Sequence, residues 1–256
     1  MTANSDQYPE PIAEARLLAT DLDGTFIGDD EAMHRLWRDL DENGITLAFS
    51  TGRHLPSIEA FYEEQQTSRR AEACITMVGT EIWLLAGDGY VEDQGWSSVI
   101  SEAWDKERVE AIIGELPNVV MQPEEWQTEF KSSYFLENGA TDGLAHIDRR
   151  LAEEGLEAKV VYSADRFLDL LPARSGKGEA VRYLADLLGI PPHEVITSGD
   201  TGNDLDMMRP ELGFRSIAVG NSAAELAEYR VPSLYHAEAP YAAGIREGLK
   251  RYGWET

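Results

Sequence analysis

The chain has 256 residues, 43% of them hydrophobic, and its 47 acidic against 22 basic side chains give a formal net charge of −25. This length and hydrophobic content suit one large domain or two smaller ones with a substantial core. The negative charge repels nucleic acids and anionic membranes, so we exclude both as partners. It would also repel a phosphorylated substrate, and a phosphate site here therefore needs local positive charge or a metal ion.

Neither cysteine chemistry nor a membrane span is expected. Cys74 is the only cysteine, which excludes an intrachain disulfide and a thiolate metal cluster. No segment is long and apolar enough to predict a transmembrane helix. The first 14 or so residues form a polar tail without the features of a signal peptide, and we expect a cytoplasmic protein.

From Arg16 onward, short apolar runs alternate with segments of helical periodicity, which is typical of βαβ units and a parallel sheet. The first expected elements are strands at 16–20, 45–49 and 73–78, with helices around 33–40 and 57–66. After Leu85, the glycines of Ala86-Gly87-Asp88-Gly89 indicate a flexible break. A second set of elements follows, namely a helix ended by Pro117, strands at 131–136 and 158–162, a helix at 142–154 and a strand at 167–171.

The parallel pattern resumes at Gly176. The elements expected there are a helix at 180–188, strands at 194–197 and 216–219, and helices near 223–229 and 242–252. The sequence therefore predicts an α/β fold. Its parallel-sheet core comprises residues 1–85 and 173–256, and an α/β unit at 86–172 is inserted into it.

Two carboxylates, Asp21 and Asp23, follow the first expected strand and precede Gly24. Both would lie at the carboxyl edge of the sheet, where open α/β folds bind ligands. One carboxylate can attack a phosphorus atom, and its neighbour can carry the protons that the attack requires. Taken alone, however, two acids at a strand end are equally compatible with a turn or a helix cap.

Three further polar turns supply complementary chemistry. Thr51-Gly52-Arg53 offers a hydroxyl and backbone amides to phosphate oxygens, although a plain turn gives the same pattern. Lys177, one of five lysines, is flanked by glycines at a helix start, where it opposes the helix dipole; a solvated lysine is the alternative. The turn at 199–204 gathers carboxylates and an amide that suit Mg2+, against the alternative of an Asx-rich loop.

In this order, with a unit inserted between the second and third, these motifs resemble those of the haloacid dehalogenase superfamily of phosphatases. Along nearly the whole chain the sequence also resembles the sucrose-phosphate phosphatase family, including its mannosylfructose-phosphate phosphatases. The segments that carry this resemblance are 20–29, 78–82, 130–136, 161–165, 169–172, 199–204 and 242–245. It implies a Rossmann-like core with an inserted α/β cap.

The resemblance also implies catalytic roles. Asp21 would attack the phosphorus and become an aspartyl-phosphate, while Asp23 would serve as acid and then as base. Thr51, Gly52 and Lys177 would bind the phosphoryl group. The Mg2+ ligands would be Asp21, the backbone carbonyl of Asp23, and Asp200, with Asn203 and Asp204 just outside. The residues expected to contact the sugar are Gly79, Thr80, Glu81, Lys131, Ser133 and Asp169.

The leading hypothesis is an Mg2+-dependent phosphatase that converts sucrose 6-phosphate to sucrose and phosphate. A mannosylfructose-phosphate phosphatase and a broader sugar-phosphate phosphatase are alternatives, as are a phosphomutase and a non-catalytic phosphosugar-binding module. A binding module has no need of a nucleophile, so the acids and Lys177 argue against it. We expect a monomer whose partner is a small phosphorylated sugar, and a sugar-phosphate synthase is a candidate protein partner.

Overall fold

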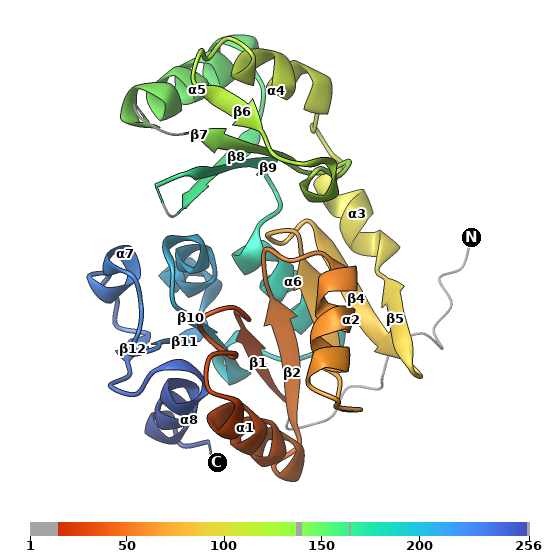
Figure 1. Ribbon diagram of the computed structural model, residues 1–256, viewed down its shortest axis with the longest axis vertical. Coiled ribbons are helices and arrows are strands. Elements are labelled where there is room, and N and C mark those ends of the chain that lie inside the picture. Colours follow the sequence, from red (N-terminus) through yellow and green to blue (C-terminus); the bar gives the residue numbers. More distant parts are fainter. Residues whose placement is uncertain (1–14, 137–139, 164, 255–256) are drawn as a thin grey trace.

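The computed structural model describes residues 15–136, 140–163 and 165–254, and Figure 1 shows a larger α/β unit with a smaller one above it. The larger unit is built on an eight-stranded sheet with the order β12-β11-β10-β1-β2-β3-β4-β5. Its strands are β1 (Arg16–Thr20), β2 (Ile45–Ser50), β3 (Ala73–Thr76), β4 (Glu81–Ala86), β5 (Gly89–Glu92), β10 (Val195–Gly199), β11 (Arg215–Ala218) and β12 (Leu234–His236). The six strands from β12 to β3 are parallel, and β4 and β5 extend the sheet antiparallel.

Helices cover both faces of this sheet because neighbouring strand residues point to opposite sides. Leu18 and Ile196 pack in one core, which the helices α1 (Asp30–Glu42), α2 (Leu55–Glu64) and α8 (Tyr241–Arg251) cover. Leu17 and Val195 pack in the other, under α3 (Gln94–Ile100) and α6 (Lys177–Leu188). Figure 1 shows α1, α2 and α8 in front of the sheet and α6 behind it. The expected α/β fold is thus confirmed.

The smaller unit, called the cap below, is a four-stranded antiparallel sheet with two helices on one face. The strand order is β6-β7-β9-β8. These strands are β6 (Val119–Met121), β7 (Ser132–Leu136), β8 (Ala158–Ser163) and β9 (Phe167–Pro172). The helices α4 (Lys106–Ile113) and α5 (Ala140–Glu154) bury the side chains of Tyr134, Leu168 and Leu170. The opposite face of the sheet is turned toward the larger unit (Figure 1).

The structure moves the start of the cap from residue 86 to about Lys106. The segment expected to be a flexible break is the two-residue turn of the β4–β5 hairpin, in which Gly87 has a φ of 65°. Glycine suits such turns because it adopts positive φ without strain. Trp96 and Ile100 of α3 then pack in the core of the larger unit. The end of the cap at Pro172 agrees with the end of β9.

The remaining elements are short, and none of the described helices could span a membrane. Helix α7 (Ala224–Ala227) and several short 3-10 helices connect the strands, among them Gly202–Met208. The polar tail expected at residues 1–14 lies outside the described residues.

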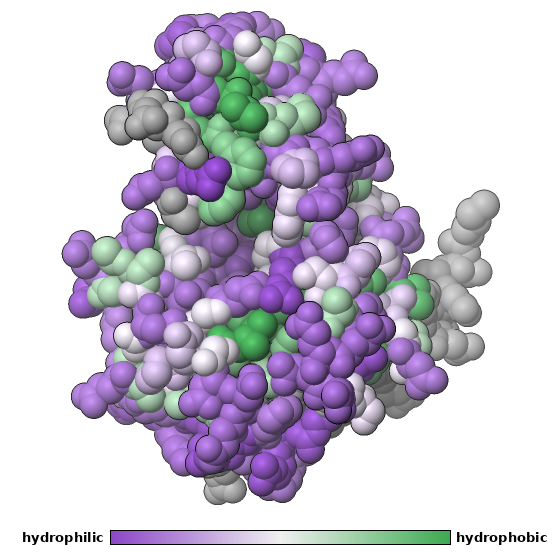
Figure 2. All heavy atoms as spheres, viewed as in Figure 1, coloured by the Kyte–Doolittle hydropathy of each residue, from purple (hydrophilic) through white to green (hydrophobic). Residues whose placement is uncertain are grey.

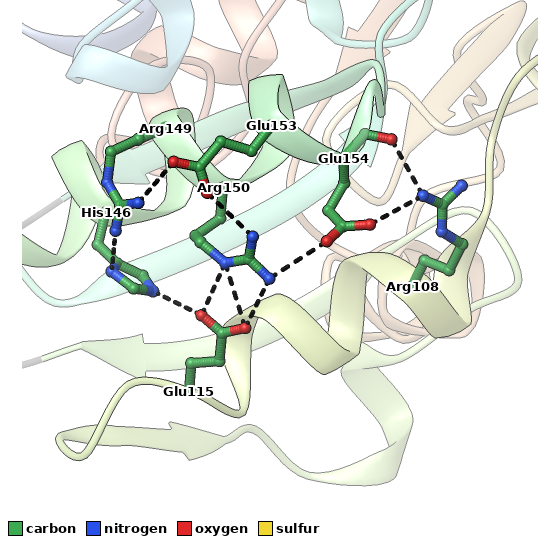
Figure 3. Close-up of polar contacts among 7 residues, drawn as sticks. All are labelled: Arg108, Glu115, His146, Arg149, Arg150, Glu153 and Glu154. Carbon is green, nitrogen blue, oxygen red and sulfur yellow. Dashed lines mark hydrogen bonds and ion pairs between the residues drawn. The ribbon is translucent and has the colours of Figure 1, made fainter.

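Charged side chains fasten the outer helices of the cap to each other (Figure 3). Glu115 accepts hydrogen bonds from Arg150 at 2.9 Å and pairs with His146 at 2.9 Å, while Arg108 reaches Glu154 at 3.2 Å. Arg150, followed by His146, lowers the pKa of Glu115 to about 2. Exposed pairs of this kind contribute little stability each. These basic side chains therefore pair within the outer layer of the cap.

Candidate active site

Three of the expected site residues meet at the centre of the sheet. Asp21, Thr51 and Asp200 directly follow β1, β2 and β10, and β1 lies between the other two strands. The chain continues from β1 toward β3 and from β10 toward β12, so the strand order reverses beside β1. Ligands of open α/β sheets bind at such a reversal.

The turn that follows β1 packs against the side chain of Asp200. The backbone N–H of Asp21 donates to Ser198 at 2.9 Å, which continues the strand pairing. Gly24 has a φ of 78°, and a Cβ atom there would collide with the Asp200 carboxylate. Thr25 donates its hydroxyl to the Oδ1 atom of Asp200 at 3.1 Å. The glycine and threonine of the motif therefore place the acids of two strands side by side.

Lys177 lies beneath these acids and is 1% exposed. Its Nζ atom donates to Asp21 Oδ1 at 2.7 Å and to Asp204 Oδ1 at 2.6 Å. Burial acts to lower the pKa of Lys177, but Asp204 and Asp21 outweigh it and raise that pKa above its usual value. Lys177 is thus a fixed cation rather than the solvated lysine of the alternative interpretation.

Asp204 is completely buried, and both of its carboxylate oxygens have partners. One accepts from Lys177, and the other accepts from the backbone N–H groups of Asp200 at 2.9 Å and Thr201 at 3.0 Å. Asn203 lies 3.4 Å from the Lys177 ammonium. These contacts hold the 199–204 turn in place, and they favour an orienting role for Asp204 over direct metal ligation.

The charges of this cluster do not balance without a cation. Carboxylate oxygens of Asp21, Asp200 and Asp204 lie within 4.8 Å of one another. Burial raises the pKa of Asp21 to about 8, with Lys177 opposing and Asp204 adding to the rise. Burial also raises the pKa of Asp200, to about 6. With all three acids ionised, one ammonium would leave two negative charges uncompensated, and the raised pKa values are the response to that excess. Mg2+ beside the oxygens of Asp21 and Asp200 would take the place of the protons, and an all-oxygen donor set suits this ion.

Magnesium should therefore stabilise the folded protein. We expect saturating MgCl2 to raise the thermal unfolding midpoint, because an ion at 100 times its Kd adds about 2.7 kcal/mol. Asp200→Asn should abolish the rise. Asp206→Asn is the matched control, since Asp206 pairs with Lys159 at 3.1 Å and should leave the rise intact. Differential scanning calorimetry with and without EDTA measures both, and an unchanged midpoint in wild type would exclude the site.

Asp23 is more exposed than the acids of that cluster, with 56% of its side chain accessible. Arg53 holds it through two hydrogen bonds, at 2.7 Å from Nε and 2.5 Å from Nη2. Such a two-point contact fixes the carboxylate in orientation as well as in place. A role for the Arg53 side chain was not predicted from the sequence, although Arg53 lies close to Thr51 in a turn that was expected to face the two acids.

The loop that carries Thr51 is held by a strained neighbouring turn. Val78 donates its N–H to Thr51 at 3.1 Å, and Met77 donates to Arg53 at 3.0 Å. Met77 and Val78 have φ values of 51° and 63°. A β-branched residue in this left-handed region is rare, and such strain concentrates at functional sites. It also explains why β3 ends at Thr76 rather than at the expected residue 78.

A cavity of about 500 Å3 separates the two units, and Figure 2 shows the hollow between them. From the larger unit, Asp21, Asp23, Thr51, Gly52 and Asn203 line it. From the cap, the lining residues include Gln122, Trp126, Lys131, Phe135, Phe167 and Asp169. Lys177 borders a second cavity of about 350 Å3 instead, so it supports Asp21 from behind.

On the cap wall, Lys131 and Asp169 form a buried ion pair of 2.9 Å. They are only 2% and 8% exposed. Ser133 donates to Asp169 at 2.6 Å and also contacts Lys131. The three cap residues expected to contact the sugar are thus brought together, with Ser133 linking two that border the cavity.

Gly79, Thr80 and Glu81 do not border either of these cavities. Thr80 donates to the Met77 carbonyl at 3.0 Å, and Glu81 accepts from the Thr76 hydroxyl at 2.6 Å. A Cβ atom at Gly79 would collide with the backbone of Gly176. Local hydrogen bonds and close packing occupy these residues, so the geometry does not support the substrate contacts that the resemblance implied.

The sequence pattern that describes the sucrose-6F-phosphate phosphohydrolase family matches residues 14–253. The chain belongs to this family. A curated relative, the mannosylfructose-phosphate phosphatase of Agrobacterium fabrum, is 34% identical over 244 residues, which cover 93% of this chain and 97% of the relative. Sucrose-phosphatase 1 of tobacco is 30% identical over 254 residues, but the match spans only 59% of that longer protein.

Solved structures agree with the family assignment. The sucrose-phosphatase of Synechocystis, solved in complex with sucrose and phosphate, is 29% identical with a TM-score of 0.86, covering 96% of this chain and all of that one. The haloacid dehalogenase subclass IIB sugar phosphatase BT4131, at 16% identity and a TM-score of 0.66, shares the fold. The family and the phosphatase class predicted from the sequence are therefore confirmed.

Proposed function

We propose that this family member is an Mg2+-dependent phosphatase of disaccharide phosphates, with sucrose 6-phosphate as the leading substrate and mannosylfructose phosphate as the second. The observation that carries the proposal is one cavity lined by Asp21 on one wall and by the Lys131–Asp169 pair on the other. Asp21, on the first wall, would attack the phosphate ester, and the polar side chains of the second wall would bind the hydroxyl groups of the sugar. The volume of about 500 Å3 suits a small-molecule site.

The chemistry would proceed in two displacements. The Asp21 carboxylate attacks the phosphorus, the bond from phosphorus to the sugar oxygen breaks, and Asp23 gives that oxygen a proton. A water molecule then gives a proton to Asp23 and attacks the aspartyl-phosphate, which frees phosphate and restores Asp21. Splitting the reaction in this way replaces one difficult step by two easier ones.

The surrounding groups would stabilise the charge that moves during these steps. Thr51 and the Gly52 amide border the cavity beside Asp21 and would bind phosphate oxygens, while Lys177 fixes Asp21 from behind. Mg2+ held by Asp21, Asp200 and the Asp23 carbonyl would offset the repulsion between carboxylate and phosphate. Asn203 and Asp204 would orient this set.

Arg53 adds a requirement that the sequence did not predict. Both oxygens of Asp23 are engaged by its guanidinium, so Asp23 has to give up one contact before it can reach the sugar oxygen. A substrate oxygen at the cavity can compete for that contact. Arg53 would thus hold the acid at the edge of the cavity until a substrate arrives.

The cap would bind the sugar and exclude water. Asp169 offers a carboxylate acceptor to the hydroxyl groups of a sugar ring, and Lys131, whose ammonium contacts Trp126, Ser133 and Asp169, would exchange one of these contacts to donate to the sugar. Because both are already desolvated, a substrate hydroxyl meets them without much further loss of hydration. The named relatives act on sucrose phosphate or mannosylfructose phosphate, and both fit this wall. We further propose that the protein works as a cytoplasmic monomer.

The test is phosphate release from sucrose 6-phosphate, mannosylfructose phosphate, trehalose 6-phosphate, mannosyl-3-phosphoglycerate and simple hexose phosphates, with Mg2+ or EDTA. We expect one disaccharide phosphate to be strongly preferred and EDTA to abolish its hydrolysis. Equal, weak activity on all substrates would contradict the proposed role of the cap. No release from any of them would favour a phosphomutase or a binding module.

A further inference from the structure

The cap wall has an aromatic end beside its polar end. Ser133 on β7 and Asp169 on β9 are directly paired, and so are Phe135 and Phe167. Residues two apart on a strand share a face and lie about 7 Å from each other. Both phenylalanines line the cavity together with Lys131 and Asp169. The cap wall of the cavity therefore carries a hydrogen-bonding patch and, two residues further along β7 and two residues back along β9, an apolar patch.

The two rings are placed on this face rather than in the core of the cap. Their centroids are 5.9 Å apart with planes inclined by 52°, and Phe167 is 39% exposed. The Arg166 guanidinium lies 4.5 Å from the centroid of Phe135. Val120, the partner of Phe135 on β6, is 62% exposed and extends the apolar strip. Figure 2 shows hydrophobic residues on this side of the cap, above the hollow.

An aromatic surface beside hydrogen-bonding groups matches the two kinds of surface on a sugar ring. The edge of the ring carries hydroxyl groups, and its faces expose C–H bonds that can pack against an aromatic side chain. In the proposed reaction the phosphate group lies at Asp21, on the opposite wall of the cavity, and the ring that bears it lies next to that wall. The ring that reaches the cap wall is then the second ring of a disaccharide.

We propose that Phe135 and Phe167 form the subsite for the sugar ring that does not carry the phosphate. The pair covers one face of that ring while the Lys131–Ser133–Asp169 group binds its hydroxyls. This subsite sets the preference for disaccharide over hexose phosphates. The inference rests on the proposed function, because it assigns the specificity of the same cavity.

The test compares Phe167→Ala with wild type on the best disaccharide phosphate and on fructose 6-phosphate. We expect kcat/KM for the disaccharide phosphate to fall roughly 10-fold or more, mainly through KM, because an apolar contact of this size is lost. Hydrolysis of fructose 6-phosphate should change by less than about twofold, because the lost contact is to a ring that this ester lacks. Phe167→Tyr should keep the wild-type preference, because its ring is retained.

Val120→Ala is the matched control, since Val120 shares the exposed apolar strip but is not among the residues that line the cavity. It should leave both substrates unaffected. An equal loss on both substrates in Phe167→Ala would show that the ring only supports the β7–β9 pair, and it would overturn the proposal. So would an unchanged preference in that variant.

A binding measurement separates this inference from the proposed function. In an Asp21→Asn background, calorimetry should show that adding Phe167→Ala weakens binding of sucrose 6-phosphate roughly 10-fold but leaves fructose 6-phosphate unaffected. If wild type hydrolyses no ester and this difference is still found, the catalytic proposal fails while the subsite stands. If esters are hydrolysed and the difference is absent, the subsite is refuted alone.

Discussion

Asp21→Asn is expected to lower kcat for the preferred substrate by roughly 10^4-fold or more, the loss typical of removing a nucleophile. Asparagine has nearly the same shape, so the hydrogen bond from Lys177 to Oδ1 can persist and the fold should be retained. The variant removes the attacking carboxylate and one negative charge of the cluster, while the remaining amide oxygen can still face Lys177 and a metal ion. Steady-state phosphate release, with circular dichroism to verify folding, measures the effect.

The same variant separates an enzyme from a binding module. A module that only senses a phosphosugar should keep its affinity and its function when Asp21 becomes Asn, whereas the phosphatase should keep affinity and lose turnover. Asp21→Ala serves as a second variant, because it cannot regain a carboxylate by deamidation. Turnover within tenfold of wild type in both variants would exclude Asp21 as the nucleophile.

Lys177→Met is expected to abolish activity and also to destabilise the metal-free protein by about 3–5 kcal/mol, as breaking a buried ion pair does. The lysine is the only cation that contacts both Asp21 and Asp204 among the described residues. Methionine has a similar length but leaves these carboxylates buried without a counter-charge. Urea unfolding followed by circular dichroism, in EDTA, measures the shift.

Two further variants test whether the loss is electrostatic. With Asp21→Asn already present, Lys177→Met should destabilise by at least about 1 kcal/mol less, because one carboxylate fewer is left uncompensated. Lys250→Met on the exposed side of α8 is the matched control and should stay within about 0.5 kcal/mol of wild type. If Lys177→Met unfolds at the wild-type urea concentration, the buried cluster does not carry the charges assigned to it.

Most of the larger unit could be predicted because its strands are buried on both faces. In β1 and β10 every residue except Arg16 is buried, and β1 is followed by residues at helical spacing that prove to be the buried side of α1. On α1, for example, Met33, Leu36, Trp37 and Leu40 are all buried. Such patterns follow directly from the geometry of helices and strands.

The β4–β5 hairpin could not be predicted in the same way. Its strands lie at the edge of the sheet, so their side chains are only partly buried and give no clear periodicity. The turn residues that join them are chemically the same as those of a linker. The three-residue strand β6 was missed for a related reason, because two of its three residues are exposed.

In the candidate site, too, some residues could be predicted from the sequence and others could not. Residues placed by backbone motifs, such as Asp21 and Asp200, could be located because the end of a strand fixes where they lie. Phe135 and Phe167 take part through pairing across the cap sheet, and sequence spacing does not reveal which strands pair. The sequence shows that Phe135 shares a strand face with Ser133, and Phe167 with Asp169. It does not show whether that face is turned toward the core of the cap or toward the cavity.

The position of β1 in the sheet also determines when the site can form. β1 is hydrogen-bonded to β2 on one side and to β10 on the other, and the cap is encoded between them. During synthesis, one edge of β1 stays unpaired until Val195–Gly199 has left the ribosome. A nascent chain that ends before Asp200 presents Asp21 without Asp200 and Asp204. The enzyme therefore gains activity only after its cap has been made, and chains truncated within the cap carry an open strand edge that favours aggregation.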